Sequence, residues 1–252
     1  MTAPFRDDFE AFDRDVWLPH YLPHWSSRAA SAATWEVDDS VLRLTVPAAQ
    51  GLWCADTHEP PLRVSGIQSG TGSGPVGSTT GQQPFRDGLT VSSAETPWVG
   101  WAPHEGRIEV RARMTLSARS MASVWMVGLE DEPDRCGELC VFEVFGRTVT
   151  ADGAEVGSGV HAFRDPALNE DFAAPRLPID VGEWHEYAAD WGPDGIDLSV
   201  DGDVVRSVSQ SLAYPLQMMI AVFDFPDWAT PQTADHVPVL EVDHVFGPAS
   251  AV

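Results

Sequence analysis

The sequence predicts an all-β fold, a β-sandwich of stacked antiparallel sheets. Apolar and polar residues alternate in several short runs, turn-forming residues separate these runs, and hardly any segment keeps a helical period. The chain contains 21 glycines and 20 prolines, residues that favour turns. Its 252 residues, 43% of them hydrophobic, suffice for one large core, and no shift in composition divides them. We therefore expect a single domain over residues 1–252.

Several runs have the alternation of half-buried strands. Residues 41–46 alternate after an Asp-Asp-Ser turn, and residues 107–116 alternate over their whole length. Further along, residues 196–200 and 204–208 flank Asp201-Gly202-Asp203, a sequence typical of a hairpin turn. Each run is expected to bury one face and to expose the other.

Residues 66–97 are the least regular part of the chain. Residues 65–75 are rich in glycine and serine, and Gln82-Gln83-Pro84-Phe85 follows after another glycine. A linker between domains has this composition, and so has a loop at the edge of a binding cleft. The position inside an undivided chain favours a loop insertion over a linker.

Residues 138–145 combine a strand-like apolar run with two glutamates, Glu138 and Glu143. A carboxylate in such a run is costly to bury unless something uses it. Because strand side chains alternate, residues an odd number of steps apart point to opposite faces, so both glutamates reach one cleft only through a β-bulge. We expect that bulge at Val141–Phe142. Carboxyl groups about 5 Å apart serve retaining glycosidases and more widely spaced pairs serve inverting ones, and two glutamates on one bulged strand fit the shorter separation.

These glutamates belong to a longer series of matches. Residues 138–143, Glu-Leu-Cys-Val-Phe-Glu, resemble the Glu-x-Asp-x-x-Glu signature of family 16 glycoside hydrolases. Further segments resemble that family's strands in the same order, namely Gly106–Arg111, Val124–Met126, Gly159–His161, Trp184–Trp191, Val200–Gly202 and Val242–Val245. The resemblance extends from about Asp7 to Phe246, nearly the whole chain.

The resemblance implies a β-jelly roll of two stacked curved sheets with a concave glycan-binding cleft. It also implies an endo-acting, retaining β-glycoside hydrolase, with a β-1,3- or mixed-linkage β-glucan as substrate and galactans as the competing class. Glu138 would be the nucleophile and Glu143 the general acid/base. Cys140 departs from the pattern, because the family has an aspartate there that tunes the protonation of both glutamates. A thiol with a usual pKa of about 8.5 is neutral at pH 7 and cannot supply that charge coupling.

Two other functions share these residues. A lectin-like glycan-binding module would have kept the fold and lost turnover through Cys140, and a transglycosylase would differ only in its acceptor-site loops. Cys140 itself is not expected to be a nucleophile, because neighbouring carboxylates raise the pKa of a thiol. The chain lacks the Gly-x-Ser-x-Gly elbow of serine hydrolases and the phosphate-binding loop of nucleotide enzymes.

Tryptophans mark the candidate sugar platforms. The chain has ten of them, and a flat indole matches the apolar face of a pyranose. Trp98 and Trp101 lie in a loop without strand periodicity, which favours stacking on sugars. Trp125, on the strand before the glutamates, fits substrate contact and core packing equally. Trp25 and Trp53 lie in irregular N-terminal stretches, where they would either build outer subsites or hold loops together.

Two further assignments come from the resemblance alone. His161 would bond a sugar hydroxyl or the nucleophile. Asp243 matches a carboxylate ligand of the structural calcium that family members often hold on the convex face, and no cofactor is expected for catalysis itself. From the residues, His20 and His24 have a four-residue gap, but the flanking prolines oppose a zinc site on one helix face. The acidic segment 130–134 lacks the alternating ligand spacing of a calcium loop.

Charge restricts the partners. The net charge is −23, and all 15 basic residues are arginines. Nucleic acid and anionic membranes are negatively charged, so we expect neither as a partner, whereas a polysaccharide or oligosaccharide remains open. No apolar run approaches the roughly 20 residues of a membrane helix. We expect a monomer that is cytoplasmic or lacks a leader, because the N-terminus has no signal-peptide pattern and three cysteines make no disulfide framework.

Overall fold

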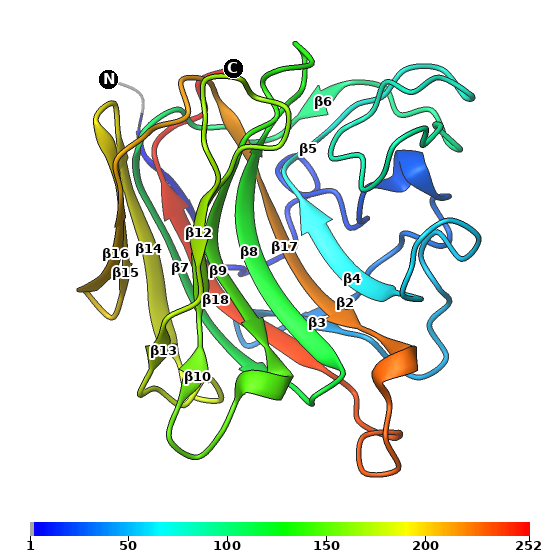
Figure 1. The fold of residues 1–252 in the computed structure, drawn as a ribbon, viewed down its shortest axis with the longest axis vertical. Coiled ribbons are helices and arrows are strands. Elements are labelled where there is room, and N and C mark those ends of the chain that lie inside the picture. Colours follow the sequence, from blue (N-terminus) through cyan, green and yellow to red (C-terminus); the bar gives the residue numbers. More distant parts are fainter. Residues whose placement is uncertain (1–2) are drawn as a thin grey trace.

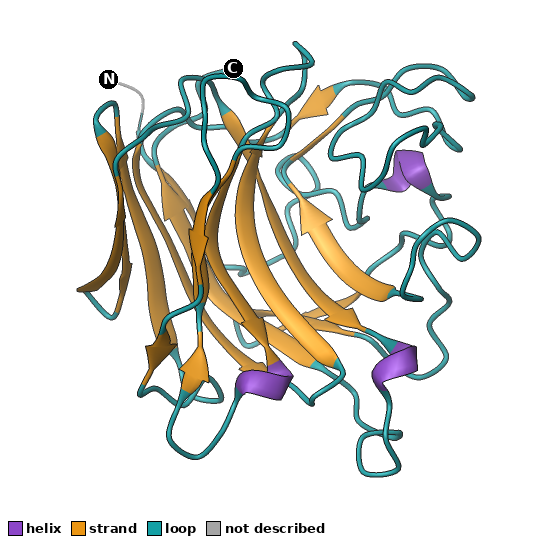
Figure 2. Ribbon diagram, in the orientation of Figure 1, coloured by secondary structure: helices purple, strands orange, loops and turns teal. Residues whose placement is uncertain are grey.

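Two curved antiparallel sheets are stacked face to face in the computed structural model, which describes residues 3–252 (Figure 1). The predicted all-β jelly-roll sandwich is therefore confirmed. Helical structure is limited to short 3-10 turns at the edges of the molecule (Figure 2), η1 (Pro23–Trp25), η2 (Gly146–Thr148) and η3 (Pro226–Trp228). None of the helices in the described residues is long and apolar enough to cross a membrane.

One sheet has eight strands in the order β16-β15-β14-β7-β18-β3-β2, with β1 also paired to β18. Its strands are β1 (Phe5–Asp7), β2 (Thr34–Asp38), β3 (Val41–Thr45), β7 (Gly106–Thr115), β14 (His185–Gly192), β15 (Gly195–Val200), β16 (Asp203–Val208) and β18 (Val239–Gly247). The strands predicted from alternation are all present here, with ends shifted by one or two residues at most.

The other sheet has six strands in the order β12-β11-β9-β8-β17-β4. Its strands are β4 (Arg63–Gln68), β8 (Ser120–Gly128), β9 (Glu138–Phe145), β11 (Gly157–His161), β12 (Asp171–Ala173) and β17 (Leu216–Asp224). Two short ladders complete the fold, formed by β5 (Gly70–Thr71) with β6 (Trp98–Val99) and by β10 (Ala154–Glu155) with β13 (Arg176–Leu177).

The six-stranded sheet is buried on both faces. Its inner face packs on the eight-stranded sheet through a core that includes Phe142 and Ile108. Its outer face carries a second apolar cluster, in which Trp53 and Leu89 from long loops cover Trp125 of β8. This double burial explains why every residue of β8 and β17 is buried. The cleft described below lies on this apolar outer face, between the sheet and the loops that cover it.

The irregular segment predicted at 66–97 packs on that outer face as a loop. Strand β4 continues to Gln68, so the irregular part begins later than expected, and the β5–β6 ladder brackets it (Figure 1). Its backbone is tied to the N-terminal loop, because the amides of Ser92 and Ser93 donate to the carbonyl of His24. The segment therefore forms one wall of the cleft rather than a linker.

Candidate active site

A β-bulge in β9 brings the two glutamates to one face of the sheet. In the ladder with β8, Val124 lies opposite Phe142 and Trp125 lies opposite Cys140, which leaves Val141 as the extra residue. The bulge predicted at Val141–Phe142 is thus present. Beyond it the alternation resumes with opposite phase, so Glu143 points outward although it lies five steps from Glu138.

A glycine on the neighbouring strand accommodates this irregularity. The β9–β11 ladder pairs Gly159 with Cys140 and Gly157 with Glu143, and its register also shifts between the two glycines. Gly159 has φ +134°, a conformation that side chains rarely adopt, and a Cβ there would lie 2.2 Å from the carbonyl oxygen of Asp171. The position therefore requires glycine, and the bulge is supported from both neighbouring strands.

The outward-facing glutamates line a cleft of about 330 Å³. Its floor is the six-stranded sheet, and its walls are the N-terminal loop and the 66–97 segment. The lining is largely aromatic and apolar, and it includes Tyr21, Trp53, Gln83, Trp125, Phe145 and Phe225. An apolar cleft with a few convergent polar groups is the usual form of a small-molecule or glycan site.

Burial makes the two carboxyl groups harder to ionise. Burial, followed by the charge of Glu143, raises the pKa of Glu138 to about 8. Burial also raises the pKa of Glu143, although the nearby charges of His161 and Arg147 lower it in part. Two coupled carboxyls of this kind titrate as a unit, and both shifts favour retention of a proton by the pair.

Cys140 lies between the glutamates as a neutral group. Its side chain is 2% exposed and belongs to the apolar cluster on the outer face of the sheet. Burial, then the charges of Glu138 and Glu143, raise the pKa of its thiol well above the usual value. Consequently, the position carries no charge at any pH at which the glutamates work.

Gln83, from the 66–97 segment, reaches the nucleophile candidate. Its Nε2 donates to Oε2 of Glu138 at 2.8 Å, and its Oε1 accepts from the indole Nε1 of Trp125 at 3.3 Å. Sequence reasoning did not identify this residue, because no strand pattern connects a loop glutamine with a glutamate 55 positions later.

His161 is on the predicted strand but its imidazole points to another partner. It lies opposite Glu138 in the β9–β11 ladder. Its Nδ1 pairs with Oε1 of Glu170 at 2.6 Å, and its ring stacks on Phe172 with centroids 4.5 Å apart. In this arrangement, His161 influences the carboxyl pair through its charge rather than through a hydrogen bond.

Comparison with known families fits this geometry. Residues 101–238, just over half of the 252-residue chain and including both glutamates, match the family described as Glycosyl hydrolases family 16. The chain belongs to glycosyl hydrolase family 16. A curated relative, Crh-like protein 2 of Aspergillus fumigatus, is 52% identical over 33 residues, which cover 13% of this chain and 7% of that protein.

Several solved glycosidase structures, whose names give different glycans, have a similar fold. A GlcNAcα1-4Gal-releasing endo-β-galactosidase from Clostridium perfringens matches with a TM-score of 0.82 at 21% identity, over 96% of this chain and 60% of that one. The laminarinase catalytic domain from Thermotoga maritima matches with a TM-score of 0.64 at 14% identity, over 98% of both chains. A lichenase from a mouse hindgut metagenome matches with a TM-score of 0.63 at 14% identity, over 98% of this chain and 100% of that one. At these identities the likeness shows the fold.

The predicted sugar-binding tryptophans divide into three groups. Trp125 and Trp53 line the cleft, although each is almost fully buried there. Trp98 lines a second hollow of about 600 Å³ in the 66–97 segment, which adjoins the cleft through Pro84, Glu130 and Arg164. The third group, Trp101 and Trp25, lies away from both hollows.

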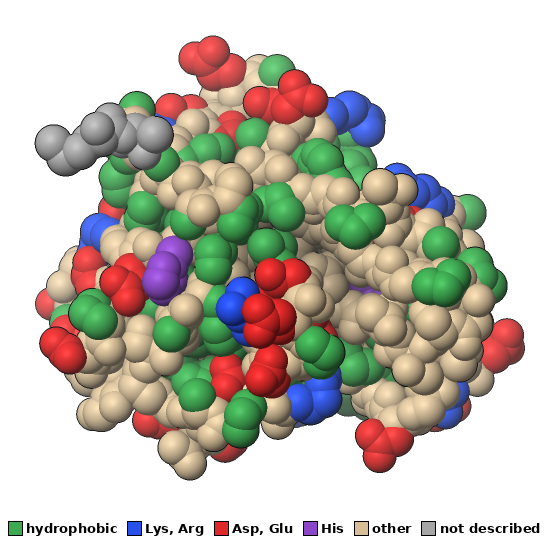
Figure 3. All heavy atoms as spheres, turned by 90° about the horizontal axis from the view of Figure 1, so that it is seen from above, with side chains coloured by type: hydrophobic (Ala, Val, Ile, Leu, Met, Phe, Trp, Pro, Cys, Tyr) green, Lys and Arg blue, Asp and Glu red, His purple; other side chains and the backbone are tan. Residues whose placement is uncertain are grey.

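Figure 3 views the molecule from above, where acidic side chains are spread over the surface.

Trp101 and Trp25 do not reach the cleft surface. Trp101 is 1% exposed, stacks on Phe5 and donates its indole hydrogen to the carbonyl of Pro248, so it is a core residue between the chain ends. Trp25 is 2% exposed and donates to the carbonyl of Gln82, so it fixes the loop that carries Gln83. The expectation of sugar contact therefore does not fit either residue: loop position alone does not distinguish a sugar platform from a loop anchor.

The structure adds an aromatic group at the other end of the cleft. Phe145, two residues after Glu143, lines the cleft together with Phe225, and Trp228 stacks on Phe225 with centroids 4.1 Å apart. The guanidinium of Arg147 lies over the rings of Phe145 and Trp228. The alternation beyond the bulge would have predicted Phe145 on the cleft face. No sequence pattern predicts that Trp228, on η3, lies beside it.

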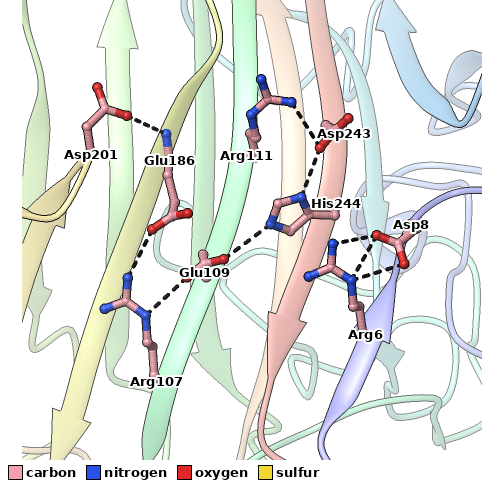
Figure 4. A network of polar contacts seen from close by, with 9 residues as sticks. All are labelled: Arg6, Asp8, Arg107, Glu109, Arg111, Glu186, Asp201, Asp243 and His244. Carbon is pink, nitrogen blue, oxygen red and sulfur yellow. Dashed lines mark hydrogen bonds and ion pairs between the residues drawn. The ribbon is translucent and has the colours of Figure 1, made fainter.

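Asp243, the predicted calcium ligand, is paired with two protein groups. On the outer face of the eight-stranded sheet, its Oδ2 accepts from Nδ1 of His244 at 2.9 Å and pairs with Nη1 of Arg111 at 3.1 Å (Figure 4). Burial alone would raise its pKa, but these two partners outweigh burial and lower it. The described residues contain no group of three or more metal-binding side chains, and calcium binding at Asp243 stays a prediction.

Proposed function

We propose that the protein is a retaining endo-β-glycosidase that uses Glu138 as nucleophile and Glu143 as general acid/base. One observation carries the proposal: a bulged strand directs both carboxyl groups into a single aromatic cleft. Neighbouring glutamates on one strand favour the short separation that retention requires. The endo-acting character follows the family and the solved structures of similar fold.

The reaction would proceed in two displacements. In the first, the Glu138 carboxylate attacks the anomeric carbon while Glu143 gives its proton to the departing glycosidic oxygen, which breaks the glycosidic bond. In the second, the ionised Glu143 takes a proton from water as the water oxygen attacks the same carbon and releases Glu138. The net change is addition of water across one glycosidic bond with retained anomeric configuration.

The productive protonation state has its proton on Glu143 and its charge on Glu138. The raised pKa values of both groups favour a proton on the pair. Glu138 is the harder of the two to keep ionised, because it is deeply buried and lies near the charge of Glu143. The positive charge that develops at the anomeric carbon in the transition state would favour the ionised Glu138.

For the substrate, we propose a β-1,3- or mixed-linkage β-glucan, with a galactose-containing glycan as the competitor. Laminarinases and lichenases among the structures of similar fold support the glucan. The TM-score of 0.82 with the Clostridium endo-β-galactosidase supports the galactan class. In either case, Trp53 and Trp125 would lie under the sugar at the cleft floor, and Trp98 would contact units further along the chain.

The test is oligosaccharide release from laminarin, lichenan, agarose, carrageenan and a β-galactan oligosaccharide, with proton NMR to follow the anomeric configuration of the first product. Glu138→Gln and Glu143→Gln are expected to abolish release. Glu36→Gln, an exposed glutamate on β2, is the matched control and should retain full activity. Glycan binding without release by the unaltered protein would instead establish the lectin-like alternative, and inverted product would reject the assigned roles.

A further inference from the structure

Gln83 is the only side chain in the described residues 3–252 that donates a hydrogen bond to the carboxylate of Glu138. The bond is 2.8 Å long and runs from the amide Nε2 to Oε2. A donor to a carboxylate stabilises its charged form. The contact thus opposes the burial that makes Glu138 difficult to ionise.

The orientation of the Gln83 amide is fixed by Trp125. An indole N–H can only donate, so the atom that it contacts must be the amide oxygen. The indole of Trp125 donates to Oε1 at 3.3 Å, which leaves the NH₂ group directed at Glu138. Because an amide NH₂ only donates, Gln83 interacts favourably with an ionised Glu138 and cannot accept a hydrogen bond from the hydroxyl of a neutral one.

The backbone of Gln83 is also held in place. Its amide donates to Oε1 of Glu130, and Glu130 forms an ion pair with Arg164. Gln83 has φ +45°, an uncommon conformation for a residue other than glycine. Positive φ at a residue bonded to a candidate catalytic group indicates that the loop is held there by its contacts.

We propose that Gln83 is a positioning residue that keeps Glu138 ionised and oriented for attack. The inference rests on the proposed function of Glu138. It assigns to the 66–97 segment a second task besides forming the cleft wall, namely preparation of the nucleophile.

The other groups that face Glu138 act in the opposite direction or not at all. From β9, Glu143 raises the pKa of Glu138, and from beyond β11, Glu170 does the same. Tyr21 of the N-terminal loop and Cys140 are held neutral by their own raised pKa values. His161, opposite on β11, is bonded to Glu170 instead. Gln83 is therefore the neighbour whose contribution lowers the pKa of Glu138.

Two variants separate this role from mere support of the loop. Gln83→Leu removes the donor, and Gln83→Glu keeps the shape but places a carboxylate beside Glu138. Both variants should move the acid limb of the kcat/KM profile to higher pH by about one unit. The expected loss of kcat/KM is about tenfold below that limb and smaller above it. Gln210→Leu is the control, since Gln210 bridges backbone groups of Asn169 in an exposed loop. Equal losses at every pH for both Gln83 variants would reduce Gln83 to a structural residue.

A measurement without turnover distinguishes failure of this inference from failure of the proposed function. In a Glu143→Gln protein with ¹³C-labelled glutamate carboxyls, NMR titration follows Glu138 directly. Gln83→Leu is expected to raise its pKa by about one unit. An unchanged pKa overturns the inference even if the enzyme hydrolyses glycans, whereas a raised pKa in a protein that hydrolyses none leaves the electrostatic role standing and rejects the enzyme.

Discussion

The guanidinium of Arg147 lies 4.4 Å from the ring centroid of Phe145, two residues along β9 from Glu143. The side chain is exposed and has no carboxylate partner among the described residues. Its positive charge lowers the pKa of Glu143. Arg147 thus opposes retention of the proton that the general acid must carry.

Arg147→Gln should move the alkaline limb of the pH–rate profile upward. Removal of the charge raises the pKa of Glu143, so the acid keeps its proton to higher pH, and we expect a shift of a few tenths of a unit for an exposed charge. The profile of kcat/KM at low salt checks this. Arg14→Gln is the control, because Arg14 also lies over aromatic rings but far from the cleft. An unmoved limb would contradict the influence of Arg147.

Cys140→Ser should leave the pH profile nearly unchanged, with activity within about threefold of the original. The thiol has a pKa raised well above its usual value and carries no charge for serine to remove. Iodoacetamide at pH 7 should also fail to modify Cys140 in the folded protein, because the thiolate is the reactive form. Rapid modification, or a profile displaced by serine, would show that the position is ionised.

Glu138→Gln should stabilise the protein, increasingly so as pH rises. The folded-state pKa of about 8 lies above the usual 4.5, so stability is fully present below pH 4.5 and is lost as pH rises towards 8. Glutamine never ionises and avoids that loss. Melting temperatures at pH 5 and pH 8 check this, with a gain of about 2–8 °C at pH 8 and a smaller one at pH 5. The same gain at both pH values would show that the stabilisation does not come from the ionisation of Glu138.

Trp101→Ala should mainly lower the stability of the protein, whereas Trp125→Ala should also lower its kcat/KM. Trp101 fills the core, so its loss should cost about 3–5 kcal/mol of unfolding free energy while KM stays near its original value. Trp125 lines the cleft and fixes Gln83, so its loss should lower kcat/KM beyond any loss of stability. Urea unfolding together with steady-state kinetics separates the two. A raised KM in a folded Trp101→Ala protein would reverse the assignment.

Chelation should leave the stability unchanged. Asp243 is bonded to Arg111 and His244, so EDTA is expected to shift the melting temperature by less than about 1 °C. Added calcium is expected to shift it by no larger amount. Arg111→Gln should lower the melting temperature, because it leaves Asp243 without its guanidinium partner. A clear rise on addition of calcium would show that a cation competes with Arg111.

The fold and the carboxyl pair could be predicted because each depends on local periodicity. Alternation in β7 and the hairpin of β15 and β16 follow from residues within one or two strands. The bulge at Val141 followed from the parity of the spacing between Glu138 and Glu143. These features require no knowledge of which distant segments meet.

The loop residues could not be predicted for the converse reason. Trp25, Trp98 and Trp101 all lie in stretches without strand periodicity, and only tertiary packing makes the first a loop anchor, the second a wall of a hollow and the third a core residue. Gln83 reaches Glu138 because Glu130 and Trp125 hold the loop from two other elements. A contact among three distant segments leaves no periodic trace in any one of them.

The extra residue at Val141 lets an odd spacing serve one face of the sheet. Deleting one residue between Glu138 and Glu143 would leave four steps between the glutamates, and a regular strand without the bulge would then still point both carboxyl groups outward. Such a deletion would change the separation of the two carboxyl groups rather than the face that they share, whereas substitutions at Val141 preserve the spacing. During evolution, therefore, the same pair of glutamates could be carried by a bulged or by a regular strand, while the 66–97 segment is tied to the site through Gln83.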